Sequence, residues 1–161
     1  MVKRLALGVS FLLMTACGGT GSVSTSSAGT PSPASSANLQ QLSQQFAALN
    51  TTANAALAGA SQQLQTAPTL DQAKAAITTA LNAYLAFDNG LQHLSLPSSM
   101  SADVTSQLHA DSLVEADYQN AESDSSLAQM QSTLATVAQD SNAAGAATII
   151  LRRDLGLPPT S

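Results

Sequence analysis

The sequence predicts an all-α protein in which an antiparallel, up-down four-helix bundle follows a disordered Ser/Thr/Gly-rich tether. From residue 38 onward, apolar residues recur at steps of three and four, which is the period of an amphipathic helix. Two breaks that contain proline and a third that is rich in serine divide this region into segments of similar length. No alternating strand pattern competes, and helices with short connections favour an antiparallel bundle.

The first predicted helix ends near Ala67-Pro68, because proline cannot continue a helix. The second helix begins at once, since Thr69 and Gln72 have the spacing of a capping box. It ends at the breaker Ser95-Leu96-Pro97-Ser98. The apolar stripe of the first helix is Leu39, Leu42, Phe46, Leu49, Ala53, Ala56 and Ala60, widened by Leu57 and Leu64. The stripe of the second is Ile77, Leu81, Tyr84, Leu85, Leu91 and Leu94.

The third helix is predicted to start near Ser101 and to be followed by a fourth helix in a different register. We therefore expect a break around residues 122–126, although no Gly or Pro marks it and one long helix is the alternative. The residues expected to point inward from the third helix are Val104, Leu108, Leu113, Val114 and Tyr118. The period of the fourth helix is Leu127, Met130, Leu134, Val137, Ser141, Ala144, Thr148, Leu151 and Leu155.

The end of the fourth helix has clear signals. Arg152 and Arg153 suit the negative end of the helix dipole, Gly156 can take the left-handed conformation after the helix, and Pro158-Pro159 prevent continuation. Much of the predicted core is alanine, which gives less apolar area per residue than leucine, so we expect modest stability. Four aromatic residues are assigned to this core rather than to a ligand site: Phe46, Phe87, Tyr84 and Tyr118.

The amino-terminal segment has the features of an export signal. Lys3 and Arg4 precede an apolar run, Leu5 to Ala16, which is too short to span a membrane. The run ends in Leu13-Met14-Thr15-Ala16-Cys17-Gly18, and Cys17 is the only cysteine. Residues 1–18 resemble the lipobox of bacterial lipoproteins. The resemblance implies cleavage before Cys17, a diacylglycerol on its thiol, and acyl chains that anchor the protein in the bacterial cell envelope, facing the extracytoplasmic side.

Four regions follow from these signals. They are a signal peptide (residues 1–16), a lipidated cysteine with a flexible tether (17–37), the helical domain (38–157) and a short tail (158–161). The tether is assigned from composition, because Gly, Ser, Thr, Ala and Pro cannot bury enough surface to offset the entropy of ordering. The alternative to lipidation is ordinary secretory cleavage after Ala16, which would leave Cys17 as a free thiol.

The excess of acidic over basic residues limits the kinds of partner that the chain can bind. It has five Lys and Arg against ten Asp and Glu, a net charge of −5, and we exclude nucleic acid as a partner. No Lys or Arg occurs between Lys74 and Arg152, where several acids gather on the third helix. Asp111, Glu115 and Glu122 can share a face, which we expect to be a solvated outer face. The alternative is a surface for a cationic partner or a divalent ion.

No motif assigns a catalytic residue, a cofactor site or a metal site. The sequence has no nucleophile elbow, phosphate-binding glycine loop or His-Glu-x-x-His, and no Glu-x-x-His pair as in ferritin-like bundles. A His/Met axial pair for haem needs His93 or His109 with Met100 or Met130, a combination that many bundles contain by chance. We instead expect His93 near a helix end and His109 on the polar face.

Two functions remain open. The first is a non-enzymatic, lipid-anchored envelope lipoprotein whose helical domain binds a protein partner or has a structural role. The second is a small-ligand, metal or haem-binding extracytoplasmic four-helix protein. An apolar cavity lined by His93 or His109 would favour the second function. A filled alanine and leucine core with polar groups only on the surface would favour the first.

Overall fold

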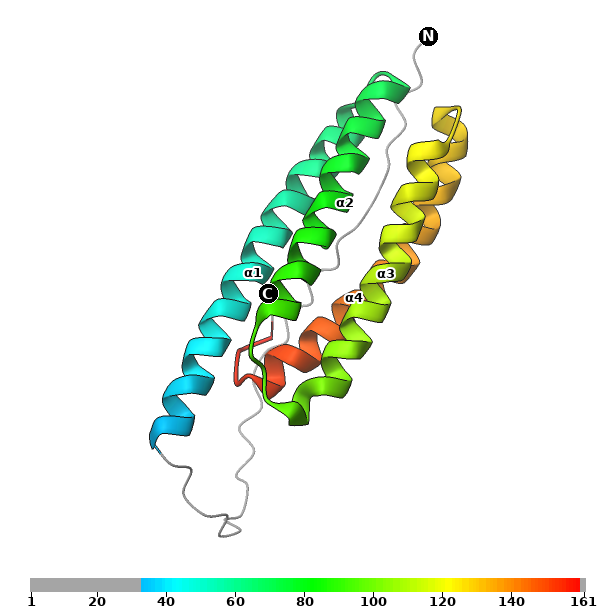
Figure 1. Cartoon of the computed structure of the whole chain (residues 1–161). Helices are drawn as coiled ribbons and strands as arrows, with labels where there is room; N and C mark the ends of the chain where they lie inside the picture. The colour runs from blue at the N-terminus through cyan, green and yellow to red at the C-terminus, as the bar shows by residue number, and fades with distance from the viewer. Residues whose placement is uncertain (1–32, 160–161) are drawn as a thin grey trace, which may run out of the picture.

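A computed structural model describes residues 33–159 of the chain. Over these residues it contains four α-helices, one short 3-10 helix and no strand, which confirms the predicted all-α bundle (Figure 1). The elements are α1 (Pro33–Thr66), α2 (Leu70–His93), η1 (Ser98–Met100), α3 (Ser101–Ser123) and α4 (Leu127–Asp154). No helix in this part of the chain is both long enough and apolar enough to cross a membrane.

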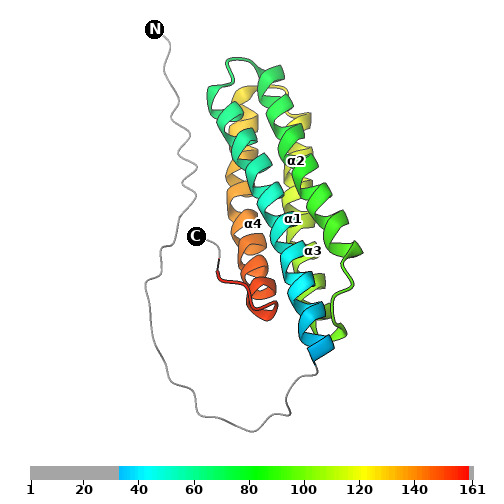
Figure 2. The same ribbon diagram turned by 90° about the vertical axis from the view of Figure 1, so that its left-hand side faces the viewer.

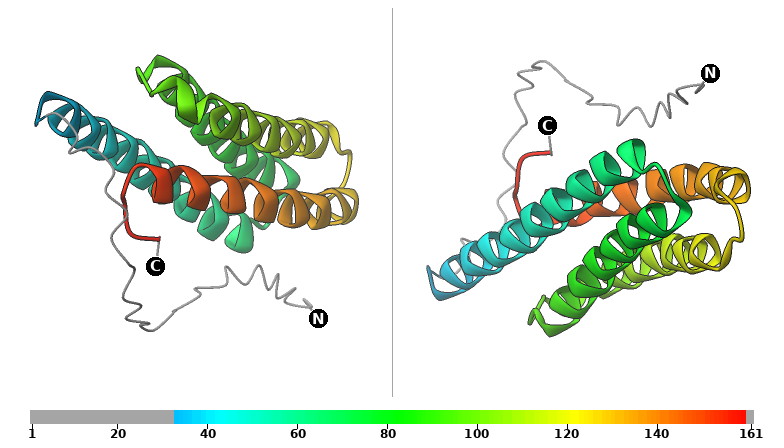
Figure 3. Two further views of the ribbon diagram at one scale, coloured as in Figure 1. Left: turned by 90° about the horizontal axis from the view of Figure 1, so that it is seen from below. Right: turned by 90° about the horizontal axis from the view of Figure 1, so that it is seen from above.

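The helices form two hairpins. α1 packs mainly on α2, α4 packs mainly on α3, and the hairpins meet mainly through a less extensive interface between α2 and α3. In Figure 1, α1 and α3 run from the lower to the upper end, and α2 and α4 run back. Figures 2 and 3 show the α1–α2 link and the α3–α4 link at the same end of the bundle, opposite to the start of α1.

α1 begins at Pro33, five residues before the predicted domain start at Asn38. Residues 33–37 were assigned to the tether from composition, and helix formation there has a local reason. Proline is well tolerated at the first helical position, and alanine is the best helix former, so this short stretch can extend a helix that is already nucleated downstream. The predicted signal peptide and the rest of the tether lie outside the described residues.

Side-chain caps define the starts of α2 and α4. Thr69 Oγ1 accepts a hydrogen bond from the backbone N–H of Gln72 at 3.3 Å, which confirms the predicted cap. Ser126 Oγ accepts from the backbone N–H of Gln129 at 3.2 Å and starts α4 in the same way. The expected break between the third and fourth helices is therefore confirmed, and the alternative of one long helix is wrong. The serine cap makes a glycine or proline unnecessary.

The core has two apolar clusters at different heights in the bundle. The upper cluster lies toward the α1–α2 link, and the lower cluster lies toward the α2–α3 link. The buried residues of the upper cluster are Ala73, Ile77, Ala110, Val114, Ala121, Met130, Leu134, Val137 and Ala144. Those of the lower cluster are Leu42, Phe46, Phe87, Leu91, Met100, Leu151 and Leu155. The aromatic residues belong to this core, as predicted, with the rings of Phe46 and Phe87 edge to face at 6.0 Å.

Four leucines of the predicted apolar stripes are exposed. The exposed fraction is 45% for Leu85, 43% for Leu113 and 37% for both Leu39 and Leu127. Leu85 and Leu113 are each next in sequence to a residue that faces the core, Tyr84 and Val114 respectively. Successive residues in a helix are rotated by about 100°, so these two leucines point away from the direction of their core-facing neighbours. The predicted inward direction of the four leucines is therefore wrong.

The carboxyl end of α4 follows the predicted signals. Gly156 has φ of +69°, in the left-handed region, and its N–H donates to the Arg153 carbonyl at 2.9 Å. The N–H of Leu157 donates to the Arg152 carbonyl at 2.8 Å, which closes the helix end. The side chain of Arg152 is buried, and its Nε donates to the Pro158 carbonyl at 2.9 Å. This contact folds the tail back against the lower cluster.

Candidate functional site

A polar layer separates the upper and lower apolar clusters. We define it as Asp88 of α2, Gln107, Asp111 and Glu115 of α3, and Thr148 of α4. Gln107 and Asp111 are each 1% exposed. Gln107 Nε2 donates to Asp111 Oδ2 at 2.7 Å, and Thr148 Oγ1 donates to Gln107 Oε1 at 2.9 Å. A buried polar group needs such partners, because without a hydrogen bond it retains the full free-energy cost of its transfer out of water.

Asp88 and Asp111 bring two carboxyl groups together across the interface between α2 and α3. Burial, together with the hydrogen bond to Asp111 and the charges of Asp111 and Glu115, raises the pKa of Asp88 to about 8. Burial also raises the pKa of Asp111, although its hydrogen bonds to Gln107 and Asp88 oppose the shift. Asp88 therefore carries a proton at neutral pH and donates it to the Asp111 carboxylate.

Glu115 and Tyr84 extend the polar layer toward the upper cluster. Burial, and then the charge of Asp111, raises the pKa of Glu115. Burial raises the pKa of Tyr84, which also has a hydrogen bond with Ser141 of α4. One oxygen each of Asp88 and Glu115 is buried without a hydrogen-bond partner within the described residues. These two oxygens are therefore the atoms of the layer whose hydrogen-bonding capacity is least satisfied.

The prediction of a solvated acidic face on the third helix is wrong. Asp111 and Glu115 do lie on the side of α3 that also carries Glu122, but this side faces α2 rather than water. Asp111 is almost fully buried, and Glu122 Oε1 accepts a hydrogen bond from Thr78 of α2 at 2.5 Å. The alternative of an open surface for a cationic partner or a divalent ion fails for the same reason, because Asp111 is not accessible.

A second acidic pair lies between α3 and α4. Burial, followed by the charge and hydrogen bond of Asp140, raises the pKa of Asp117. One oxygen of Asp117 is also buried without a partner in the described part of the chain. The acids of α3 therefore meet other acids on both neighbouring helices. Neither arginine of α4 neutralises them, since Arg152 bonds to Pro158 and Arg153 pairs with Asp154 at 2.8 Å.

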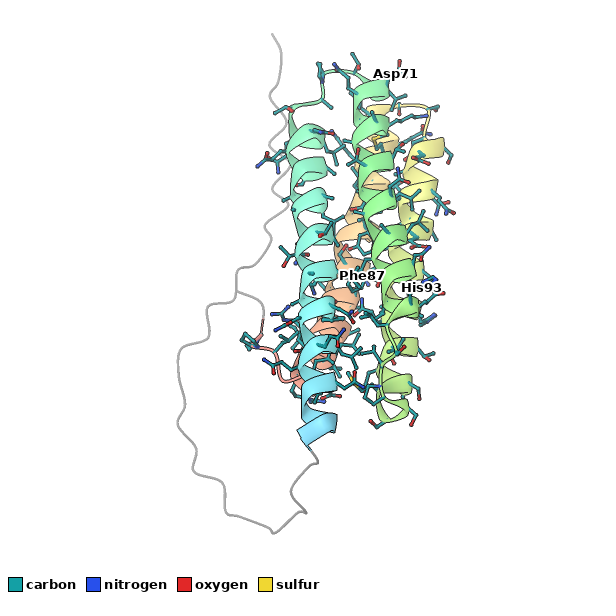
Figure 4. All side chains as sticks on the ribbon, turned by 60° about the vertical axis from the view of Figure 1, so that its left-hand side comes forward. Asp71, Phe87 and His93 are labelled. Carbon is teal, nitrogen blue, oxygen red and sulfur yellow. The ribbon has the colours of Figure 1, made fainter. Side chains whose placement is uncertain are left out.

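The α1–α2 hairpin carries an open groove of about 730 Å³. Most of its lining is small or apolar, namely Ala48, Leu49, Ala53 and Ala56 of α1 and Ala83, Ala86, Phe87, Gly90 and Leu94 of α2. The other lining residues are uncharged and polar, except for His93. We call this feature the α1–α2 groove. Figure 4 shows Phe87 on α2 and His93 beyond it, near the carboxyl end of the helix.

Gly90 leaves space for the Leu49 side chain of α1 beside the groove. A Cβ atom at position 90 would come within 2.5 Å of Leu49 Cδ2, so any larger residue would displace this leucine. α1 contains no ionisable side chain over its whole length. The groove is therefore formed between a helix without charge and a helix stripe of small residues, which suits a close-packed apolar occupant.

The structure does not bring the histidines and methionines together. Met130 is buried in the upper cluster and Met100 in the lower cluster, whereas both histidines are exposed. His93 is the last residue of α2, and its Nδ1 lies 2.7 Å from the Asn89 carbonyl oxygen. The expected positions of His93 and His109 are confirmed. Among residues 33–159, no three His, Cys, Asp or Glu side chains have an arrangement that could hold a metal ion.

Neither the polar layer nor the groove is among the features predicted from the sequence. Two signals for the layer were present, because Ser141 and Thr148 occupy core positions in the period of the fourth helix. Asp88 also lies between the stripe residues Tyr84 and Leu91, at steps of four and three. Polar residues on an apolar stripe indicate a buried polar contact. The groove has no such signal, since alanine is common throughout the chain.

The predicted lipid-attachment residue, Cys17, lies outside the described residues and stays a prediction. Comparison of the chain with protein-family models, with curated proteins and with solved structures finds no match.

Proposed function

We propose that this protein is a non-enzymatic lipoprotein of the bacterial cell envelope, anchored through Cys17, whose helical domain binds an apolar helix of another envelope protein. The observation that carries the binding role is the α1–α2 groove. Its lining has no acidic side chain, lysine or arginine, so a helix with an uncharged apolar face fits it best. The lipobox resemblance of residues 13–17 supports the anchor.

The small side chains of the groove favour a helix over an irregular peptide. Alanine and glycine allow two helix backbones to approach closely, so that a third helix can pack against the hairpin with its side chains between α1 and α2. The floor is apolar because Ala83 and Phe87 are buried beneath it, with exposed fractions of 6% and 7%. The acidic residues of the polar layer do not line the groove.

A small apolar ligand is the second candidate occupant. The groove has a volume in the range of about 300–1,000 Å³ that small-ligand sites have, and His93 lies at one end of it. The two conditions set out from the sequence are each met in part. His93 lines an apolar hollow, but the hollow is open rather than enclosed, and the core holds buried polar groups as well as apolar ones.

A pair of photo-crosslinking positions on α1 tests the groove. Ala48 lines the groove and Ala55 does not, and both are exposed on the same helix. A photoreactive phenylalanine at position 48, but not at 55, should give in the native cell a product whose crosslinked peptide is an apolar helical segment. Ala86→Glu should reduce this product at least tenfold, because a carboxylate inside the groove is costly to bury. The matched exposed control, Ala75→Glu, should not.

Four results would decide against a partner helix. Equal products from both positions, or a product that Ala86→Glu does not reduce, would exclude the groove as the binding site. A crosslinked peptide that is charged and extended would exclude a helix. Native mass spectrometry that finds a bound small molecule, lost in Ala86→Glu and kept in Ala75→Glu, would establish the second candidate instead.

Mass spectrometry of the mature amino terminus tests the anchor separately. The terminal residue should be Cys17 carrying a diacylglycerol, and the Cys17→Ser protein should move from the membrane fraction to the soluble fraction. An unmodified Cys17, or a Cys17→Ser protein that stays with membranes, would remove the anchor from the proposal.

A further inference from the structure

The α2–α3 interface is the principal connection between the two helical hairpins. It is less extensive than the interfaces within the hairpins, and α1 and α4 do not add a comparable one. Figure 1 shows each hairpin as a pair of adjacent helices. Both apolar clusters also contain residues of both hairpins, so the α2–α3 interface and these clusters together hold the hairpins against each other.

Like charges, without a neutralising cation, are concentrated at this same interface. α2 contributes Asp88 and α3 contributes Asp111 and Glu115, with Glu122 bonded to Thr78 at the upper end. Tyr84 of α2 and Tyr118 of α3 lie alongside, with ring centroids 6.0 Å apart. From α4 the neighbouring groups are Ser141 and Thr148, which do not titrate, and α1 has no ionisable side chain.

The nearest basic groups in sequence do not act on these carboxyls. Lys74 precedes Asp88 by almost four helical turns, about 20 Å along α2. His93 is bonded at its own helix end, His109 is exposed, and Arg152 is held by the Pro158 carbonyl. Asp111 is buried and Asp88 is partly exposed, so the two carboxyl groups are most stable side by side while at least one proton is shared between them, because two adjacent carboxylates repel each other.

We propose that the α2–α3 interface is a pH-dependent latch, in which a proton shared by Asp88 and Asp111 stabilises the contact between the two helical hairpins and its loss weakens that contact. This inference does not rest on the proposed partner helix. The layer that forms the latch is the same one that divides the apolar core. Loss of the proton loosens the interface at the polar layer, whereas the apolar clusters above and below it, which contain residues of both hairpins, do not titrate.

The direction of the pH effect follows from the raised pKa of Asp88. In the folded protein Asp88 holds its proton up to a pH of about 8, whereas in the unfolded chain an aspartate loses it near pH 4. Between these values the unfolded chain binds fewer protons, so stability falls as the pH rises. The fall begins above about pH 4, continues to about pH 8 and then levels off.

The Asp88→Asn variant tests the latch in the full-length protein in mild detergent. Asparagine imitates the neutral acid and can still donate to Asp111. The wild-type Tm should fall by roughly 5 °C between pH 6 and pH 8.5. This fall is smaller than the full pKa shift of Asp88 would give, because solvent screens a partly exposed group. In Asp88→Asn most of this fall should disappear. Asp71→Asn, an exposed change on the same helix, should keep it.

Hydrogen exchange locates the opening. At pH 8.5, backbone amides on the facing sides of α2 and α3 should exchange about tenfold faster in the wild type than in Asp88→Asn, and at pH 6 the two proteins should agree. The intrinsic exchange rate cancels because the proteins are compared at one pH. Asp111→Asn provides a second variant if Asp88→Asn does not fold, since the carbonyl of the introduced amide can still accept from Gln107.

Either of two results would overturn the latch. A wild-type Tm that does not depend on pH between 6 and 8.5 would show that the pair has no ionisation to lose. Faster exchange that is spread evenly over all four helices would show a global loss of stability without a specific weakening of the α2–α3 interface.

Discussion

The two ends of the bundle and its middle are stabilised by different interactions. In the lower cluster, Phe46 and Phe87 are buried and pack edge to face, and nothing in this contact titrates. In the polar layer, Gln107 bonds to Asp111 and Thr148, and Asp111 shares a proton with Asp88. The lower cluster therefore supplies stability that is independent of pH, and the polar layer makes the bundle sensitive to pH. This division is informative because alanine leaves the ends with little apolar area to spare.

Removal of a ring from the lower cluster should have the largest effect. Phe46→Ala leaves a cavity at a side chain that is 0% exposed, and the free energy of unfolding should fall by about 3–5 kcal/mol. Urea denaturation at pH 5 and pH 9 should give the same loss, because no ionisable group lies at the site. A loss that grows with pH would contradict the separation of the core into ends and middle.

Removal of the central amide of the polar layer should have an intermediate effect. Gln107→Leu keeps the size of the side chain but removes the donor to Asp111, so the free energy of unfolding should fall by about 1–3 kcal/mol. The loss should be greater at pH 9 than at pH 5, since above about pH 8 Asp88 no longer donates a proton to the Asp111 carboxylate and the Gln107 amide remains as its donor. Gln119→Leu on the exposed side of α3 is the matched control and should show no such pH dependence.

The smallest effect is expected at the edge of the layer. Thr148→Val removes the hydroxyl that donates to Gln107 at 2.9 Å, and the loss should be about 1 kcal/mol or less, because the acceptor left behind is neutral. The loss should be the same at pH 5 and pH 9. Thr136→Val, exposed on α4, provides the baseline. If Thr148→Val lowers the free energy of unfolding more than Gln107→Leu does, the Gln107 amide contributes mainly through its bond to α4 rather than through its bond to Asp111.

The fold could be predicted from the sequence because its signals are local. Thr69 and Gln72 cap α2 at the predicted place, and Gly156 ends α4 in the left-handed conformation that its position suggested. The register mismatch between the third and fourth helices also located their break, since each period can be read from one segment. A boundary without a sharp local signal is not located from the sequence, as the earlier start of α1 at Pro33 shows.

The site could not be predicted because it depends on how the helices are rotated against one another. The general preference of carboxylates for water placed Asp111 on the surface, whereas the rotation of α3 places it against Asp88 of α2. Whether a polar residue on a helix faces water or another helix is decided by packing, which one segment does not contain. The core positions of Ser141 and Thr148, and the position of Asp88 on the stripe of the second helix, are the local indications of a buried polar contact.

The polar layer also has a consequence for alignment along the bundle axis. Alanine-rich helices have nearly uniform surfaces, so sliding one past another by a turn, about 5.4 Å, costs little where only small apolar groups meet. The Asp88–Asp111 pair and the Thr148–Gln107 bond remove this freedom, because one such step breaks both contacts and leaves their polar side chains buried without partners. The polar layer therefore fixes the longitudinal position of α3 relative to both α2 and α4.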